Sequence, residues 1–270
     1  MIRMFEYDSK LAQSLSRVPV HQPSIIRVIQ GEKSLLWQDD ALAVNAEQLL
    51  LLPAGCHISF VNRPMSGRYR AVQLLLPYEL PSGVMLAATD RQIPKPTQTI
   101  SRSVDFAWNA LLHSLTLALP TSVQMHYLAA LLLSLPQQAS VNWLYSHKPA
   151  NVSQAVLGLL GQHPSAPWQQ EEIADKLHMS TASLRRKLAQ EDTSFRQLLA
   201  EVRLCQGLTL LQNSTDSVLQ IALACGYLSA EKFSARFKQA FGLTPAAYRR
   251  TLCATLIVIT RSRHGRRTIH

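Results

Sequence analysis

Residues 168–250 contain two segments with similar side chains in the same order, and some of these side chains could recognise a polyanion. The segments EEIADKLHMSTASLRRKLAQ (Glu171–Gln190) and VLQIALACGYLSAEKFSARFKQAFG (Val218–Gly242) both place an Ile-Ala pair before a turn. After the turn, each has a Ser or Thr that can start a helix, and that helix carries basic residues. The chemistry that these residues could supply is hydrogen bonding and charge pairing. Two consecutive helix-turn-helix units are the interpretation that fits this repeat.

In a helix-turn-helix, the second helix lies in the DNA major groove, where each base pair presents its own pattern of donors and acceptors. Ala174 and Ala222 supply the small residue needed where the two helices cross. The apolar residues predicted to face inward are Leu184, Leu188, Phe233 and Phe237. The residues predicted to face the DNA are Thr181, Ala182, Ser183, Arg185, Arg186, Ala230, Glu231, Lys232, Ser234, Arg236 and Lys238.

The overall charge supports a polyanionic partner only weakly. The formal net charge is +10 and the isoelectric point is about 9.8. Residues 168–250, however, hold 11 Lys and Arg against 8 Asp and Glu, whereas residues 251–270 hold 4 against 0. The repeat itself, rather than its charge, therefore predicts double-stranded DNA as the partner.

Residues that would indicate an enzyme or a metal site are sparse. His57 has no second His nearby and no following Glu, so we expect neither metal ligands nor catalytic residues, and no cofactor. The four cysteines show no C-x-x-C spacing and are expected to be buried thiols. Without a signal-peptide pattern or a long apolar run, a soluble cytoplasmic protein with no membrane partner is expected.

Seven capped helices are predicted to position the two DNA-facing sets within residues 151–250. They are Val152–Gln162, Gln169–Leu177, Thr181–Gln190, Phe195–Gln212, Val218–Cys225, Ala230–Phe241 and a short helix from Thr244-Pro245 to Arg250. The fourth of these would span about 27 Å at about 1.5 Å per residue. With the width of its neighbours, that length suits two major-groove segments about 34 Å apart on one face of a duplex.

The first part of the chain is predicted to be a small antiparallel barrel or sandwich, cupin-like in rhythm, able to hold a small molecule. Residues 1–20 are predicted to be irregular. The predicted strands are Ile25–Ile29, Ser34–Trp37, Ala41–Val44, Gln48–Leu52, His57–Val61 and Tyr69–Leu76. The chain is thus expected to be an α+β multidomain protein, with an N-terminal cupin-like β-barrel and an all-α C-terminal domain.

Two apolar helices, over Ser101–Leu119 and Ser122–Leu135, are predicted to form a hairpin. They either cover the open side of the barrel or form a homodimer interface through residues 101–135. The predicted domains are residues 1–136 for the barrel with this hairpin, 137–150 for a linker, and 151–250 for the DNA-binding domain. Residues 251–270 are predicted to be a basic, poorly ordered tail.

The two helix-turn-helix units share a longer motif that includes polar as well as apolar residues. Its positions are Trp168, Ile173-Ala174, Met179-Ser180 and Leu184-Arg185-Arg186-Lys187-Leu188, then Ile221-Ala222, Gly226-Tyr227, Phe233-Ser234, Phe237-Lys238, Phe241-Gly242, Thr244-Pro245 and Tyr248-Arg249. Across residues 151–250 this pattern closely resembles the AraC/XylS family of bacterial transcription regulators, and in particular its enteric virulence and acid-resistance activators. Two departures are His178, where Gly often makes the first turn, and Ala235, where Arg is common.

The resemblance implies a promoter-binding regulator, usually an activator that works with RNA polymerase on the nucleoid. It also implies a sensing and dimerisation domain at the N-terminus, with a small molecule, in some members a fatty acid, bound at the junction of the two domains. A carboxylate ligand would need a cation near apolar walls. The candidates near the start of the barrel are His21, Arg27 and Lys33.

Other functions remain open at this point. A ligand-independent activator or repressor controlled by its abundance fits the same motifs. A cupin-type enzyme would need a cluster of metal ligands, and His57 alone does not supply one. A purely architectural DNA-bending protein would have no use for the first domain, and sequence-selective footprints would exclude it.

Overall fold

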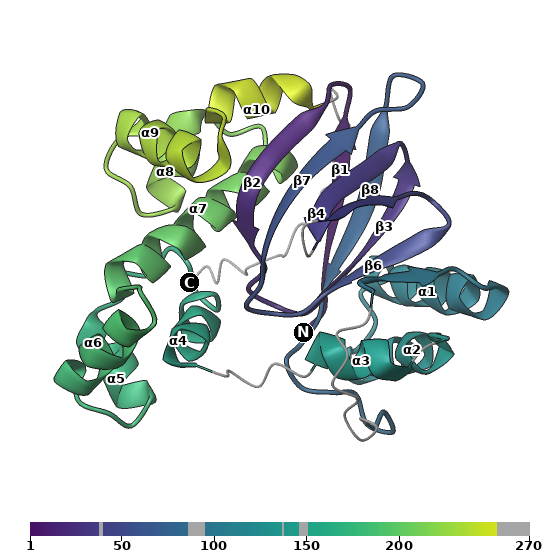
Figure 1. Cartoon of the computed structure of the whole chain (residues 1–270), viewed down its shortest axis with the longest axis horizontal. Coiled ribbons are helices and arrows are strands. Elements are labelled where there is room, and N and C mark those ends of the chain that lie inside the picture. The colour runs from purple at the N-terminus through teal and green to yellow at the C-terminus, as the bar shows by residue number, and fades with distance from the viewer. Residues whose placement is uncertain (38–39, 86–94, 137, 146–150, 253–270) are drawn as a thin grey trace, which may run out of the picture.

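A computed structural model of the chain describes residues 1–37, 40–85, 95–136, 138–145 and 151–252 (Figure 1). Antiparallel sheets and three helices make up the N-terminal part, and helices alone make up residues 151–251. The predicted α+β organisation is confirmed. Beyond Leu252, the predicted basic tail lies outside the described residues. None of the helices that the structure describes is both long and apolar enough to cross a lipid bilayer.

The strands form a five-stranded sheet in the order β1-β8-β3-β6-β9 and a four-stranded sheet in the order β2-β7-β4-β5, with all pairs antiparallel. The strands are β1 (Arg3–Ser9), β2 (Gln13–Pro19), β3 (Ser24–Gln30), β4 (Glu32–Trp37), β5 (Asp40–Val44), β6 (Gln48–Leu52), β7 (His57–Arg63), β8 (Tyr69–Leu75) and β9 (Thr97–Thr99). The six predicted strands are all present, with shifts at their ends.

The prediction that residues 1–20 are irregular is wrong. This segment forms β1, which pairs with β8 from Arg3 opposite Leu75 onward, and β2, which pairs with β7. Both strands lie at the edge of their sheets, where one side needs no strand partner and the sequence can stay polar. Their apolar pattern is therefore weak, and the pairing that defines them is with residues far along the chain.

Strand β6 shows how the sheets are packed, because its run of leucines is buried on both faces. Leu50 and Leu52 lie between the two sheets, with Ile26, Leu35 and Ile58. Leu49 and Leu51 face the other way, into a cluster formed with the helices of the N-terminal part. The five-stranded sheet is thus covered by the second sheet on one face and by helices on the other (Figure 1).

Those helices are α1 (Arg102–Thr116), α2 (Thr121–Ser134) and α3 (Gln138–Tyr145). The first two form the predicted hairpin. Helix α3 lies inside the segment predicted as a linker, and it packs onto the N-terminal part through Val141, Trp143 and Leu144. The Trp143 ring meets Trp37 edge to face, with 5.4 Å between ring centroids.

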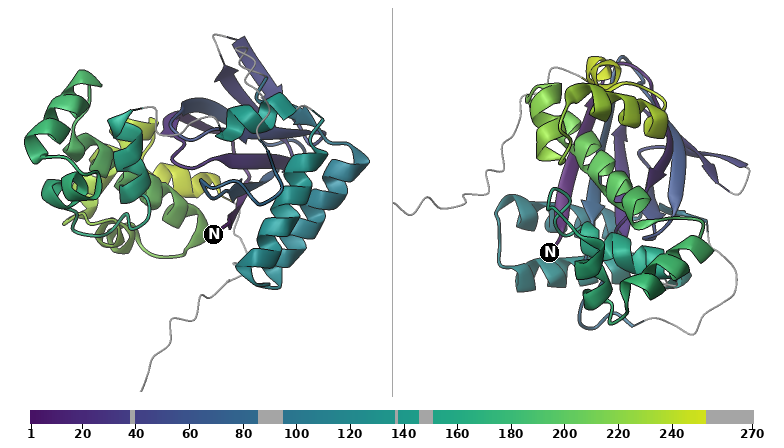
Figure 2. Two further views of the ribbon diagram at one scale, coloured as in Figure 1. Left: turned by 90° about the horizontal axis from the view of Figure 1, so that it is seen from below. Right: turned by 90° about the vertical axis from the view of Figure 1, so that its left-hand side faces the viewer.

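The C-terminal part contains the seven predicted helices: α4 (Val152–Leu160), α5 (Gln170–Lys176), α6 (Thr181–Gln190), α7 (Phe195–Asn213), α8 (Val218–Ala224), α9 (Ala230–Phe241) and α10 (Pro245–Thr251). Helix α7 joins two apolar clusters, one with α4, α5 and α6 and one with α8, α9 and α10. Figures 1 and 2 show α8, α9 and α10 beside β2, with α5 and α6 at the opposite end of α7.

Candidate nucleic-acid interface and interdomain cavity

The first helix-turn-helix unit consists of α5, a turn at His178, and α6. His178 has φ +54°, a left-handed conformation that His enters more readily than most residues, so it can replace the expected Gly. The Ser180 side chain accepts a hydrogen bond from the Ser183 backbone N–H and so caps α6. Leu184 and Leu188 are buried as predicted. The opposite side of α6 is open to solvent and presents Arg185 and Arg186.

The second unit consists of α8, a turn at Gly226, and α9. Ser217 and Gln220 form a reciprocal capping box at the start of α8, and Ser229 caps α9. Gly226 takes φ +78°, the equivalent of His178 in the first unit. Phe233, Phe237 and Phe241 of α9 are buried, and neighbouring rings in this series lie 5.6 and 4.7 Å apart. Their aromatic packing holds the helix against α7 and α10.

The structure places the residues predicted to contact DNA on the outer faces of α6 and α9. Exposed among them are Ala182, Arg185, Arg186, Glu231, Lys232, Arg236 and Lys238. Partly exposed are Thr181, Ser183, Ala230 and Ser234. In α9, Arg236 donates to the Gln239 side chain at 3.1 Å, which the sequence analysis did not anticipate. These faces can donate to and accept from bases and phosphates.

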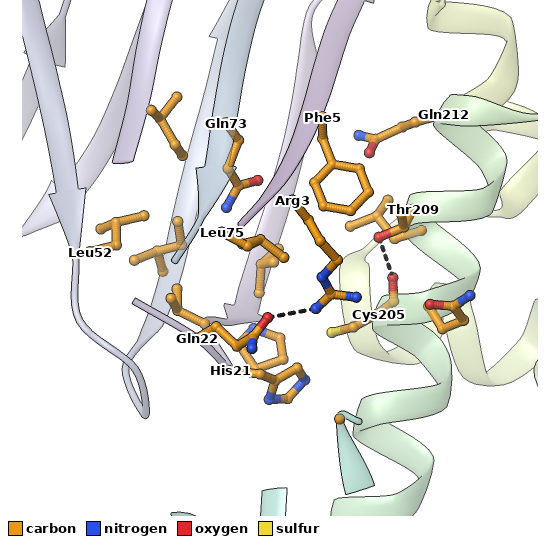
Figure 3. Close-up of a pocket in the computed structure, with 18 of the residues that line it drawn as sticks. Arg3, Phe5, His21, Gln22, Leu52, Gln73, Leu75, Cys205, Thr209 and Gln212 are labelled. Atoms are coloured by element: carbon orange, nitrogen blue, oxygen red, sulfur yellow. Dashed lines mark hydrogen bonds between the residues drawn. The ribbon is translucent and has the colours of Figure 1, made fainter. Parts of the chain in front are cut away.

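A cavity of about 170 Å³ lies between the N-terminal sheets and α7 (Figure 3). Its walls are largely apolar and include Phe5, Leu15 and Ile58 from the strands and Leu208 from α7. Cys205, Thr209 and Gln212 of α7 line the same side in Figure 3. A molecule in this cavity would touch both the N-terminal part and the helix that joins the two helix-turn-helix units.

Lys33 is the buried cation of this cavity, with a residue exposure of 4%. Its ammonium donates to Asn62 Oδ1 at 2.7 Å and lies 3.4 Å from the centroid of the Phe60 ring. Burial lowers the pKa of Lys33 to about 7, because the charged form loses its hydration. A carboxylate entering the cavity would find a donor that forms no ion pair with any of the described residues.

His21 also lines the cavity, and both of its ring nitrogens are buried without a hydrogen-bond partner among the described residues. Burial lowers the pKa of His21 to about 4, although Glu201 of α7 acts in the opposite direction. The distance from His21 Nδ1 to Glu201 Oε1 is 4.0 Å. Because the ring is neutral near pH 7, this contact is not an ion pair there.

Of the three cations predicted for a ligand, His21 and Lys33 line the cavity and Arg27 does not. Arg27 instead forms an ion pair with Asp105 of α1 at 2.7 Å. Arg3, which the sequence analysis missed, does line the cavity and donates to Gln22 at 2.5 Å (Figure 3). Burial lowers the pKa of Arg3. Sequence reasoning could have found Arg3 only by recognising β1 as a strand.

His57 lies at the start of β7, and its Nε2 is 3.6 Å from Glu201 Oε2. No cluster of three or more His, Cys, Asp or Glu side chains suited to a metal ion occurs in the part of the chain that the structure describes. Cys56, Cys205 and Cys225 are free thiols, and burial raises the pKa of each. Cys253 lies outside the described residues.

Comparison with known proteins decides the nature of the C-terminal part. A family model described as a helix-turn-helix domain matches residues 173–251. The transcriptional regulator SirC of Salmonella typhimurium is 41% identical over 85 residues, which are 32% of this chain and 29% of SirC. Residues 173–251 form a helix-turn-helix domain of the AraC/XylS family. The urease operon transcriptional activator of Escherichia coli is 38% identical over 97 residues, which are 36% of this chain and 33% of the activator.

The chain thus matches about a third of the length of these curated relatives. Several solved structures of ToxT compare with nearly the whole chain. Fatty-acid-bound ToxT from Vibrio cholerae covers 94% of this chain and 96% of its own, with a TM-score of 0.64 and 14% identity. At that identity the likeness shows the fold alone, in which strands at the N-terminus precede a helical domain.

Proposed function

We propose that this protein is a sequence-specific transcriptional regulator that reads two adjacent major-groove segments with α6 and α9. The observation that carries the proposal is the pair of capped helices whose apolar sides are buried in the two clusters along α7 and whose polar sides are exposed. A helix with one buried and one polar exposed side is what major-groove docking requires. The relatives of the AraC/XylS domain are regulators and activators of transcription, which supports the same role.

We further propose that a small molecule with a carboxylate and an apolar tail regulates this activity from the interdomain cavity. Lys33 would bind the carboxylate, His21 and Arg3 line the same cavity, and the apolar walls would bury the tail. The fatty acid bound to ToxT supports this class of ligand, because the two folds are similar. A ligand that contacts strands and α7 together could change how the AraC/XylS domain is held.

Activation through RNA polymerase and dimerisation through residues 101–135 belong to the same proposal. Helix α2 supports dimerisation, because Val123, Tyr127, Ala130 and Leu133 form an exposed stripe at helical spacing. A regulator of this kind would act in the cytoplasm on promoter DNA. No cofactor takes part in this function as we propose it.

The test begins with duplexes enriched by the full-length protein from a random pool, followed by footprinting on the enriched sequence. Two protected major-groove segments on one face of the duplex are expected. Arg185→Ala is expected to weaken binding to the enriched duplex by about 1–3 kcal/mol and to relax the base preference, because Arg185 would lose a base contact. Lys238→Ala is the matched control and is expected to weaken binding to enriched and random duplexes by similar factors.

Failure to enrich any sequence would overturn the proposed function. Equal losses for both variants on both duplexes would contradict the assignment of Arg185 to base recognition. For regulation, the same binding is measured with and without a long-chain unsaturated fatty acid. An unchanged affinity, together with no binding of the fatty acid to the free protein, would leave abundance rather than this ligand class as the control.

A further inference from the structure

Helix α7 passes through two separate apolar clusters, and Arg203 lies where the helix leaves one and enters the other. The α7 residues of the first cluster are Phe195, Leu198 and Val202, and those of the second are Leu204, Leu208 and Leu211. Among the described residues the two clusters have no member in common. Apolar packing therefore holds each helix-turn-helix unit to α7, but it does not hold the units to each other.

The Arg203 guanidinium contacts the backbone of the loop that leads into the first unit and the backbone of the turn in the second unit. Its Nη2 donates to the carbonyl of Ala166 at 3.2 Å, and its Nη1 lies 3.5 Å from the carbonyl of Gly226, to which it donates. Ala166 is in the loop that leads into α5, and Gly226 is in the turn between α8 and α9. A guanidinium is planar and holds its donors at fixed angles, so it can keep two carbonyls in one relative orientation.

Gly226 leaves room for the Arg203 guanidinium because it has no side chain of its own. A Cβ atom at Gly226 would lie 2.8 Å from the Arg203 Cζ, closer than such contacts allow, and φ is +78° at this residue. The turn of the second unit therefore approaches the guanidinium as closely as a residue without a side chain permits. This close approach makes the contact with the second unit a packed one as well as a hydrogen bond.

We propose that Arg203 is a positioning residue that fixes the orientation of α6 relative to α9 and thereby sets the spacing of the two DNA segments that are recognised. This inference rests on the proposed function. Each base pair inserted between two segments of B-DNA separates them by about 3.4 Å and rotates one relative to the other by about 34°. A rigid pair of helices accepts a single spacing, whereas a loosened pair accepts several.

The experiment measures binding of the full-length protein to the enriched duplex and to versions with base pairs added or removed, in single steps, between the two footprinted segments. The wild-type protein is expected to show a sharp optimum. In Arg203→Lys the charge and the aliphatic stem remain, but one ammonium cannot hold two carbonyls at a fixed angle. Its affinity for the optimal duplex is expected to fall about tenfold, with little change for the altered spacings, because linked binding depends on geometry.

Arg249→Met is the matched control. Arg249 also donates to two carbonyls, those of Asp216 at 2.6 Å and Ser214 at 3.4 Å, but both belong to the loop between α7 and α8. Its overall affinity can change, yet its preference for spacing is expected to match the wild type. Thermal unfolding of each variant shows whether it is folded.

A wild-type spacing profile in Arg203→Lys would overturn the inference, as would an equally flattened profile in Arg249→Met. Failure of the proposed function is visible separately, since the wild-type protein would then lack two protected segments or any preferred sequence. Arg203→Met extends the series by removing the donors altogether. It is expected to flatten the profile at least as much as Arg203→Lys.

Discussion

Lys33 is the residue of the cavity whose charge depends on pH near neutrality. Its ammonium is buried against Phe60 and Asn62, and the pKa falls from the usual 10.5 to about 7. In the unfolded chain the same lysine keeps its proton up to about 10.5. Lys33 therefore holds fewer protons in the folded protein than in the unfolded chain between those two pH values, so its contribution to stability rises with pH across that window.

We expect the variant Lys33→Met to be more stable than the wild type below pH 7, where the wild type must bury a charge. The difference in the free energy of unfolding should shrink as pH rises from 7 toward 10.5, because the wild-type lysine is then neutral when folded. Urea unfolding of both proteins across this range measures it. A difference that stays constant with pH would contradict the lowered pKa.

The same shift bears on the proposed ligand. A carboxylate binds the protonated lysine, so binding should take up a proton where free Lys33 is neutral, and affinity should fall as pH rises above about 7. Both effects come from one buried charge. Their signs are opposite, because the unliganded fold disfavours the proton and the ligand favours it.

Helix α2 exposes apolar side chains on the side that faces away from the sheet. Leu128, Leu131 and Leu132 are buried against α1 and the sheet, while the stripe of Val123, Tyr127, Ala130 and Leu133 remains exposed. A helix that is apolar on more than one side is usually covered by a partner. The proposed partner is the same surface of a second copy, related by a twofold axis.

We expect Tyr127→Glu to convert a dimer of the full-length protein into a monomer, because it buries a charge at the centre of the stripe. Thr121→Glu places the same charge in the exposed first turn of α2, on the side of the helix away from the stripe, and should leave the dimer intact. Sedimentation velocity over a range of concentrations distinguishes them. A wild-type protein that stays monomeric, or equal dissociation of both variants, would refute dimerisation through α2.

At the scale of the whole molecule, the second helix-turn-helix unit packs against the N-terminal sheets. Leu15 of β2 lies in the same apolar cluster as Phe233 and Phe237 of α9. The end of α10 is held by backbone hydrogen bonds from Lys10 and Leu11 to the Thr251 carbonyl. The first unit takes no part in that cluster. The two units are therefore held differently by the N-terminal part.

Gln13 connects the cavity, through hydrogen bonds, with the contact between α10 and the N-terminal part. The Gln13 side chain is buried, accepts from Asn62 at 3.0 Å and donates to the Thr251 hydroxyl at 2.8 Å, and Asn62 in turn accepts from Lys33. Hydrogen bonds thus run from the cavity lysine to the end of α10. Loss of the Gln13 amide would leave buried polar groups of both parts unsatisfied.

We expect Gln13→Leu to lower the free energy of unfolding by about 1–3 kcal/mol and to loosen α10 from the sheets. Hydrogen exchange at the Lys10 and Leu11 amides, which donate to Thr251, should become faster. Gln30→Leu is the control, since Gln30 donates to the Met65 carbonyl within the N-terminal part alone. Unchanged exchange at Lys10 in Gln13→Leu would contradict the coupling.

Much of the C-terminal part could be predicted from the sequence because its determinants are local. Ser180, Ser217 and Ser229 cap helices a few residues away, and Gly242 ends α9 with φ +88°. The spacing of Phe233 and Phe237 is enough to decide which side of α9 is buried. These are interactions within a few turns of the chain, so a single sequence reveals them.

The tertiary structure alone decided the edge strands, the cavity and the roles of Arg3, Arg27 and Arg203. Strand β1 exists because residue 3 meets residue 75, and Arg203 matters because it reaches Ala166 and Gly226 together. Such contacts join residues far apart in the chain and leave no period in the sequence. Local chemistry therefore determined which helices form and which sides they bury, while the long-range packing determined what those helices and strands enclose.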